Sequence, residues 1–264
     1  MTPILMLGAG RMGGAMIEGW RRVGVFPTVD LILRDPQPNA AAQATAKAGA
    51  RLNPPETVLT QAGTVLLAVK PQMWREAVAE IEPFLAKDAV IVSIMAGVKT
   101  ADIAQACGGR PVARVMPTTA VAIAHGTATI YAPDESARAR AHALFAPVGR
   151  VVDVDEEELM HAATAVSGSA PAYLYAFVEA LEAAGVAVGL SPEASANLAR
   201  ATIAGAAALM AHSDEDPAEL RRQVTSPAGT TEAALKVLMG GDGLGPLLEK
   251  AVAAAVKRSK ELGS

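Results

Sequence analysis

The chain is poor in several residue types, and each scarcity excludes a class of protein. A single cysteine, Cys107, excludes an intrachain disulfide framework and a metal site built from several thiolates. A net charge of -4 offers no basic surface for nucleic acid. No apolar stretch approaches the ~18 residues of a membrane span, and the N-terminus lacks the basic segment of a signal peptide. We therefore expect a cytoplasmic protein with no metal ion, no nucleic-acid partner and no membrane segment.

The first half of the sequence alternates short apolar runs with helical patterns. Continuous apolar runs of this length are typical of strands buried on both faces of a parallel sheet. Strand and helix in alternation predict an α/β fold with a doubly wound, mostly parallel sheet, that is, a Rossmann domain over residues 1–154. The expected strands are residues 4–7, 31–33, 65–69, 90–94, 112–116 and 150–154.

The second half, residues 155–264, contains Ala-rich helical patterns and no convincing strand. Ser191 and Asp216 each precede a proline, which is typical of a helix start, and Gly185 and Gly189 are expected helix ends. We therefore expect an all-α C-terminal domain. Its small side chains let helices approach closely, but a helical domain this thin leaves apolar surface uncovered. A partner subunit would cover it, so we expect an obligate homodimer, either alone or within a higher oligomer.

A glycine-rich loop follows the first expected strand and precedes a helix. Its residues are Gly8, Ala9, Gly10, Arg11, Met12 and Gly13. In the pattern G-x-G-x-x-G the first glycine permits a tight turn, the second lets the backbone approach a pyrophosphate, and the third packs helix against strand. The alternative is an ordinary glycine-rich turn. The strand and helix on either side favour a dinucleotide-binding loop.

Adjacent charges end the second expected strand, where the adenosine ribose of a dinucleotide lies. Asp35 would accept a hydrogen bond from a ribose 2′-hydroxyl, whereas Arg34 would pair with a 2′-phosphate. Arg34 and Asp35 could equally well be solvated charges of the loop that bind no ligand. We favour Arg34 and NADP(H), with NAD(H) as the alternative.

Two further loops leave the carboxyl ends of expected strands, where open α/β sheets bind ligands. We expect them to flank the nicotinamide, where Lys70 would attract a phosphate; Lys70 is equally explained as a charge at a helix start that binds no ligand. They contain Ala68, Val69, Lys70 and Pro71 in the first loop, and Ala96 and Gly97 in the second.

Two segments of the second half are richer in Ser, Thr, Gly and Pro than plain helix packing requires. In residues 165–173 these residues interrupt a helical pattern, which predicts a kink or a break between two helices. In residues 224–232 they precede an apolar helix, and the free N–H groups of a helix start suit a small carboxylate. Spacing alone favours a simpler interpretation, a well-capped helix with Glu232 in its first turn.

The chain resembles the pyrroline-5-carboxylate reductase family along its whole length. The likeness runs through residues 8–13, 68–71, 93–98, 114–117, 166–173 and 225–231, and residues 226–231 are its most specific block. The resemblance implies a Rossmann domain, a helical domain that interlocks with a second subunit, and NAD(P)H-dependent reduction of 1-pyrroline-5-carboxylate to L-proline. It also favours a ligand-binding role for residues 226–231 over capping alone.

The resemblance further implies roles for individual residues. The backbone of Gly229, Thr230 and Thr231 would hold the substrate carboxylate. The Thr231 hydroxyl would hydrogen-bond the ring nitrogen and help to deliver its proton, with Ser226 lining the same pocket. The chain departs from the family pattern at three positions: Thr118, where Asn is usual, Ala120, where Pro is common, and Ala228, which is often Gly.

The chemistry of the substrate agrees with the residues that are missing. An imine nitrogen is basic enough to arrive protonated, so its reduction needs no strong general acid. The chain has no lysine between Val151 and Leu235, whereas β-hydroxyacid dehydrogenases of the same architecture use a helical-domain lysine. The remaining alternatives are another imine or β-hydroxyacid oxidoreductase on this scaffold, and a non-catalytic dinucleotide sensor.

Overall fold

The computed structural model describes residues 1–262 and divides the chain into two compact units. The first unit is Met1–Gly168 together with the end of the chain from Ala255, and the second is Ser169–Ala254. The last strand ends at Asp153, one residue before the expected boundary at residue 154, whereas the first compact unit continues to Gly168. The compact unit continues beyond that strand because the following helix and turn contact the sheet.

An eight-stranded sheet forms the centre of the first unit, in the order β3-β2-β1-β4-β5-β6-β7-β8. The strands are β1 (Ile4–Leu7), β2 (Leu31–Arg34), β3 (Arg51–Leu52), β4 (Thr64–Leu67), β5 (Val90–Ser93), β6 (Val112–Pro117), β7 (Gly126–Tyr131) and β8 (Gly149–Asp153). The chain leaves β1 first toward β2 and later returns to its other side as β4. The strand order therefore reverses between β1 and β4, which is the switch point where such sheets bind ligands.

The sheet is mostly parallel, which confirms the predicted fold class. Among the described strands, the β6–β7 pair alone is antiparallel. Two strands were not predicted. β3 has only two residues, and β7 alternates Thr127 and Thr129 with apolar residues instead of forming a continuous apolar run.

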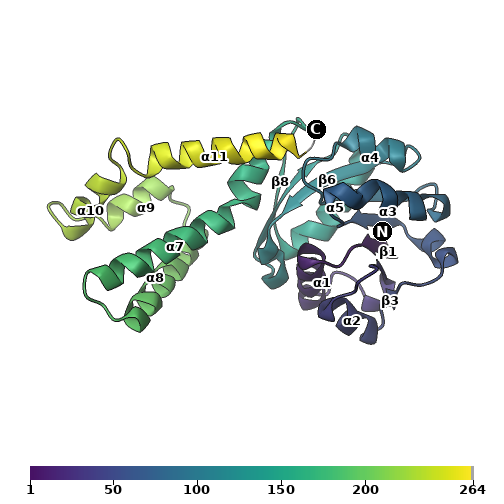
Figure 1. Ribbon diagram of the computed structural model, residues 1–264, viewed down its shortest axis with the longest axis horizontal. Coiled ribbons are helices and arrows are strands. Elements are labelled where there is room, and N and C mark those ends of the chain that lie inside the picture. The colour runs from purple at the N-terminus through teal and green to yellow at the C-terminus, as the bar shows by residue number, and fades with distance from the viewer. Residues whose placement is uncertain (263–264) are drawn as a thin grey trace. The chain divides into compact units, whose positions relative to one another are not determined.

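Helices bury both faces of this sheet (Figure 1). One core cluster joins the sheet to α1 (Arg11–Val23), α2 (Ala40–Lys47) and α5 (Glu135–Phe145). The other joins it to α3 (Trp74–Ile81) and α4 (Thr100–Ala106). Along β1, Ile4 and Met6 belong to the first cluster, and Leu5 and Leu7 to the second. Because successive strand residues point to opposite faces, all four are apolar and buried.

Short helical turns connect these elements. The 3-10 turns are Thr28–Asp30, Glu56–Gln61, Pro71–Met73, Glu82–Phe84, Thr119–Ile123 and Ala146–Val148. After β8 follow α6 (Leu159–Ala163) and a π-helical turn at Thr164–Gly168. This turn separates α6 from α7 (Ala170–Ala187) and confirms the break predicted in residues 165–173.

The second unit contains only helices among its described residues. They are α7, α8 (Pro192–His212), α9 (Pro217–Gln223) and α10 (Thr230–Leu238); α11 (Leu244–Glu261) begins there and ends in the first unit. Both predicted helix starts are confirmed. Ser191 Oγ accepts a hydrogen bond from Ala194 N at 3.2 Å, and Asp216 Oδ1 accepts one from Glu219 N at 2.8 Å.

The two glycines expected to end a helix behave differently. Gly189 follows α7 with a φ of 107° and confirms the prediction. For Gly185 the prediction is wrong, because α7 continues to Ala187. A Cβ at Gly185 would lie 2.1 Å from Ser195 Oγ. This glycine therefore lets α8 approach α7 closely.

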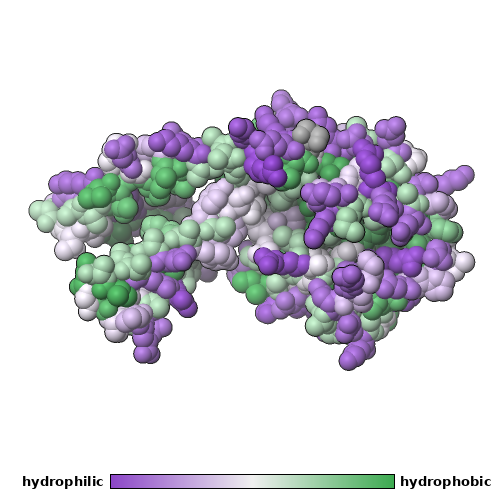
Figure 2. Space-filling model, in the orientation of Figure 1, coloured by the Kyte–Doolittle hydropathy of each residue, from purple (hydrophilic) through white to green (hydrophobic). Residues whose placement is uncertain are grey.

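The helices of the second unit expose much apolar surface within one chain. α7 has no buried residue, and Val188, Tyr175 and Leu198 are 84%, 67% and 57% exposed. Figure 2 shows apolar surface over this part of the chain, at the left of the view. None of the helices in residues 1–262 is long and apolar enough to cross a membrane.

Candidate functional site

The glycine loop lies between β1 and α1 and has the three geometries that its pattern predicts. Gly8 has a φ of 85°, and a Cβ there would lie 2.8 Å from Ala68 O. A Cβ at Gly13 would lie 2.6 Å from Gly8 O, so α1 packs directly on the loop. A Cβ at Gly10, the N-cap of α1, would meet no protein atom within 4 Å. The backbone at Gly10 is therefore open to a ligand, as a pyrophosphate site requires.

Two side chains from the segment after β2 hold the middle of this loop. Ala9 N donates to Asp35 Oδ2 at 2.7 Å, and Asn39 Nδ2 donates to Ala9 O at 2.5 Å. Asn39 also caps α2, since its Oδ1 accepts from Ala42 N at 2.9 Å. Sequence reasoning missed Asn39 as a site residue, although an Asn before an Ala-rich helix is a recognisable N-cap. The loop is therefore fixed before any ligand binds.

The two charges at the end of β2 have different partners. Arg34 Nη2 lies 2.8 Å from Glu56 Oε1, and Arg34 Nη1 donates to Pro54 O at 3.2 Å. A backbone hydrogen bond and then the Arg34 guanidinium lower the pKa of Glu56. The structure thus places Asp35 beside the glycine loop and Arg34 against Glu56. Contact between Arg34 and a 2′-phosphate stays a prediction.

The two loops expected near the nicotinamide follow β4 and β5, which are neighbours in the sheet. The first loop meets the glycine loop directly, because the carbonyl of Ala68 lies against Gly8. Lys70 is exposed and precedes the turn that begins at Pro71. In the second loop Gly97 has a φ of 81°, a conformation that favours glycine. Both loops lie at the carboxyl edge of the sheet with the glycine loop.

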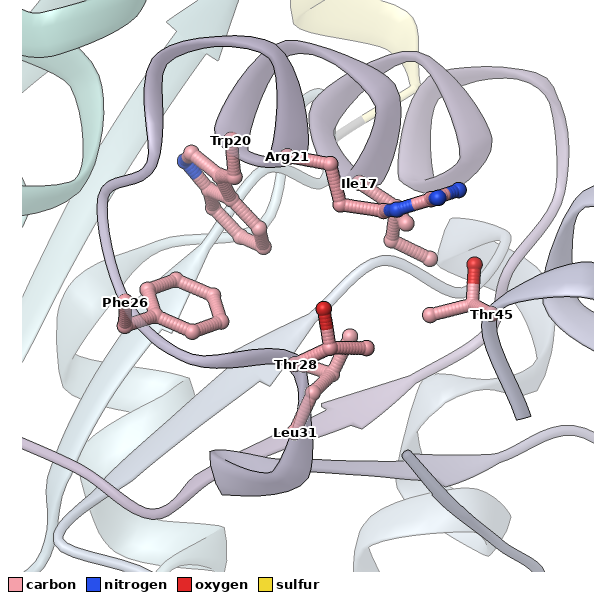
Figure 3. A pocket seen from close by; sticks show the side chains of 7 residues that line it. All are labelled: Ile17, Trp20, Arg21, Phe26, Thr28, Leu31 and Thr45. Carbon is pink, nitrogen blue, oxygen red and sulfur yellow. The ribbon is translucent and has the colours of Figure 1, made fainter. Parts of the chain in front are cut away.

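The first unit also has hollows away from the glycine loop. A gap of about 10 Å³ between α1 and β2, lined by Trp20, Phe26 and Leu31 among others, has room for no more than one water (Figure 3). A hollow of about 310 Å³ lies beside Pro71 and Val98. No residue of the glycine loop lines either of them.

The loop of residues 226–231, here called the hydroxyl loop, joins α9 to α10. Gly229 N donates to Ser226 O at 3.0 Å and closes a turn. Gly229 is the N-cap of α10, and no side chain caps it. Capping by the loop's Ser and Thr hydroxyls, the simpler interpretation of the sequence, is therefore not what the structure shows. Glu232 lies in the first turn of α10, as predicted. Its Oε2 accepts a hydrogen bond from Ala228 N at 2.5 Å.

The start of α10 offers backbone donors for an anion. The first intrahelical bond runs from Ala233 N to Gly229 O at 3.2 Å, so the preceding N–H groups have no intrahelical partner. These include the N–H groups of Thr230 and Thr231. The N–H of Gly229 is already used within the turn, so Gly229 shapes this site. Thr231 is half-buried, whereas Ser226 and Thr230 are exposed.

Thr118, which stands where the family usually has Asn, is hydrogen-bonded to the sheet next to β6 and β7. It is 8% exposed, its N–H donates to Thr127 O at 2.9 Å, and its Oγ1 accepts from Thr127 N at 3.0 Å. These two bonds join the end of β6 to the start of β7. The hydroxyl is therefore satisfied by backbone.

The first unit also contains a buried polar cluster. Arg114 is 3% exposed and its Nη1 lies 2.7 Å from Glu157 Oε1. Glu157 also accepts from Thr100 N at 2.8 Å. His161 is 6% exposed and its Nδ1 lies 2.9 Å from Ser259 Oγ in α11. Burial, and then the charge of Arg114, lower the pKa of His161.

Comparisons with known proteins place the chain among reductases. Residues 157–262 match the family "Pyrroline-5-carboxylate reductase dimerisation", and residues 3–97 match "NADP oxidoreductase coenzyme F420-dependent". A pyrroline-5-carboxylate reductase of Pseudomonas aeruginosa is 38% identical over 99% of this chain and 97% of its own length.

Solved structures agree over the whole chain. A pyrroline-5-carboxylate reductase from Coxiella burnetii superposes with a TM-score of 0.90 at 30% identity, covering 100% of this chain and 99% of the other. A pyrroline carboxylate reductase from Plasmodium falciparum, solved with NADP bound, has a TM-score of 0.85 at 26% identity, covering 100% and 98%.

Proposed function

The chain belongs to the pyrroline-5-carboxylate reductase family, and we propose that it reduces 1-pyrroline-5-carboxylate to L-proline with NAD(P)H. One observation carries the proposal: a relative that is 38% identical over 99% of the chain bears this activity in its name. The glycine loop in the first unit and the hydroxyl loop in the second provide the two binding elements that the reaction needs.

The residues of the first unit fit a dinucleotide. Gly10 leaves the backbone at the start of α1 open, and Asp35 and Asn39 fix the peptide at Ala9. Arg34 is the cation at the ribose end and would exchange its bond to Glu56 for a 2′-phosphate. When bound, the reduced nicotinamide supplies the hydride.

The residues of the second unit bind the substrate and guide its proton. The N–H groups of Thr230 and Thr231 hold the carboxylate at the start of α10, where the helix dipole favours an anion. The Thr231 hydroxyl hydrogen-bonds the ring nitrogen and holds its proton in place, while Ser226 lines the same pocket. A protonated imine needs no charged acid, which suits a loop that carries only hydroxyls.

We further propose a cytoplasmic homodimer. The exposed apolar faces of α7 and α8 support the dimer, as does the match of residues 157–262 to a dimerisation family. The lone unpaired Cys107 supports a reducing compartment. Sedimentation at micromolar concentration should give at least twice 27.0 kDa, and a mass of 27.0 kDa would contradict the dimer.

Cofactor oxidation tests the reaction. NADPH and NADH absorbance is followed with pyrroline-5-carboxylate and, separately, with other cyclic imines and with β-keto acids. We expect turnover with the pyrroline carboxylate. Turnover with a keto acid alone identifies a hydroxyacid oxidoreductase, and dinucleotide binding without any turnover identifies a sensor.

Substitution at Thr231 tests its role. Losing a preorganised donor typically costs about 10²–10³ in rate, so Thr231→Ala should lower kcat/KM by this factor. Thr231→Ser is the matched control, because it keeps the hydroxyl. If the alanine variant stays folded and fully active, the assignment is wrong.

A further inference from the structure

The hydroxyl loop contains a residue in a costly backbone conformation. Ala228 has a φ of 58°, the left-handed region, where the Cβ of an L-residue approaches its own backbone too closely. Glycine adopts this conformation without that cost, and glycine is common at this position in the family that the chain resembles. Some interaction must hold Ala228 in this conformation.

The side chain of Glu232 provides that interaction. Its Oε2 accepts the hydrogen bond from Ala228 N at 2.5 Å. Its Oε1 lies 3.1 Å from Lys236 Nζ, one helical turn further along α10. Among the described residues, no other side chain is hydrogen-bonded to the backbone of residues 226–231. Among the described residues, the Glu232 side chain therefore makes the hydrogen bond that links the backbone of this loop to α10.

We propose that Glu232 is a positioning residue for the reaction and that it acts through Ala228. The peptide of Ala228 directs the chain into Gly229 and then into the first turn of α10. The N–H groups of Thr230 and Thr231 begin in that turn. When Glu232 holds Ala228 in its left-handed conformation, these N–H groups are presented together to a carboxylate. This inference rests on the proposed binding of the substrate carboxylate there.

A double-mutant cycle measures this action through Ala228. Glu232→Ala should raise KM for pyrroline-5-carboxylate about tenfold, the loss expected for one charge-assisted hydrogen bond, with kcat nearly unchanged. In the Ala228→Gly background the same substitution should raise KM threefold or less, roughly, because glycine populates the left-handed region unaided. An equal loss in both backgrounds would overturn the proposal.

Two single variants separate positioning from general stability. Glu232→Gln retains an acceptor for Ala228 N and should restore KM to within about threefold of wild type. Lys236→Met removes the exposed ion pair alone and should leave KM unchanged. A purely structural role predicts instead that Glu232→Ala lowers the melting temperature while KM stays the same at temperatures where the variant is folded.

Amide hydrogen exchange distinguishes failure of this proposal from failure of the proposed function. Inactivity of the wild-type protein toward pyrroline-5-carboxylate would refute the function. If the exchange rate of the Ala228 amide is unchanged in Glu232→Ala, the proposed hold of Glu232 on the Ala228 N–H is refuted, whatever the activity. We expect that exchange to accelerate in Glu232→Ala and to stay slow in Lys236→Met.

Discussion

Three glycines of the loop–helix junction provide a test in which stability and cofactor binding change separately. Gly10, Gly13 and Gly14 are neighbours in sequence, yet an added methyl group meets a different environment at each. At Gly13 it would lie 2.6 Å from Gly8 O, at Gly14 it would lie 3.7 Å from Ala41 Cβ, and at Gly10 it meets nothing within 4 Å.

The expected stabilities follow from these distances. Replacing a helical glycine with alanine stabilises by roughly 0.5–1 kcal/mol when space allows, which is the case at Gly14. Gly13→Ala gains the same but forces the Gly8 carbonyl to move, and overpacking typically costs about 1–3 kcal/mol. Gly13→Ala should therefore be less stable than Gly14→Ala by about 1–3 kcal/mol, a gap of several degrees in Tm. Gly10→Ala changes only an N-cap and should cost ~1 kcal/mol or less.

Cofactor affinity should follow a different order. Gly10→Ala places a methyl group where the pyrophosphate must approach the backbone, so the Kd for NADPH should rise about tenfold or more. Gly14→Ala should bind as wild type. Thermal melts and a fluorescence titration with NADPH measure both quantities. Wild-type affinity in Gly10→Ala would show that the pyrophosphate binds elsewhere, and equal stability of Gly13→Ala and Gly14→Ala would refute the close packing of loop and helix.

Three further predictions concern groups of the first unit. Glu157→Ala leaves Arg114 buried without its partner and should cost about 3–5 kcal/mol in chemical denaturation, whereas Glu158→Ala, at an exposed pair, should cost ~0.5 kcal/mol or less. Because burial lowers the pKa of His161, the stability that depends on its neutral form should be lost as pH falls below its ordinary value of 6.5. Tm should therefore decline less with acid in His161→Gln, and equal declines would contradict this. Burial raises the pKa of Cys107 to about 11, so a thiol reagent at mildly alkaline pH should modify it only after unfolding; rapid modification of the native protein would be inconsistent with its burial.

The sequence predicted those parts of the fold that local pattern determines. Residues 4–7 are apolar throughout because the strand is buried on both faces, and this pattern can be seen in the local sequence alone. The glycine loop and the Ser191 and Asp216 helix starts depend on adjacent residues only. β7 escaped prediction because Thr127 and Thr129 interrupt its apolar residues, of which Ala128 and Ile130 belong to the core.

Long-range geometry was beyond prediction. The hydrogen bonds of Asp35 and Asn39 to Ala9 join residues 26 and 30 positions apart, and nothing in the local sequence announces them. The local sequence predicts a helix end at Gly185. The other reason for a glycine there, the close approach of Ser195 on a neighbouring helix, cannot be seen in the local sequence. Ala228 is the clearest case. An alanine in the sequence predicts neither a positive φ at that position nor the hydrogen bond from its N–H to the Glu232 carboxylate.

The return of the chain to the first unit at Ala255 has a consequence for how the protein is made. The first unit is discontinuous: its last helical turns are synthesised only after the whole second unit. Until then His161 lacks Ser259, and the surface that α11 covers is exposed on the nascent chain. A chain that stops before Ala255 therefore has every strand of the sheet but an incomplete unit. Truncation before Ala255 should consequently lower the stability of the first unit, although all of its described strands are present.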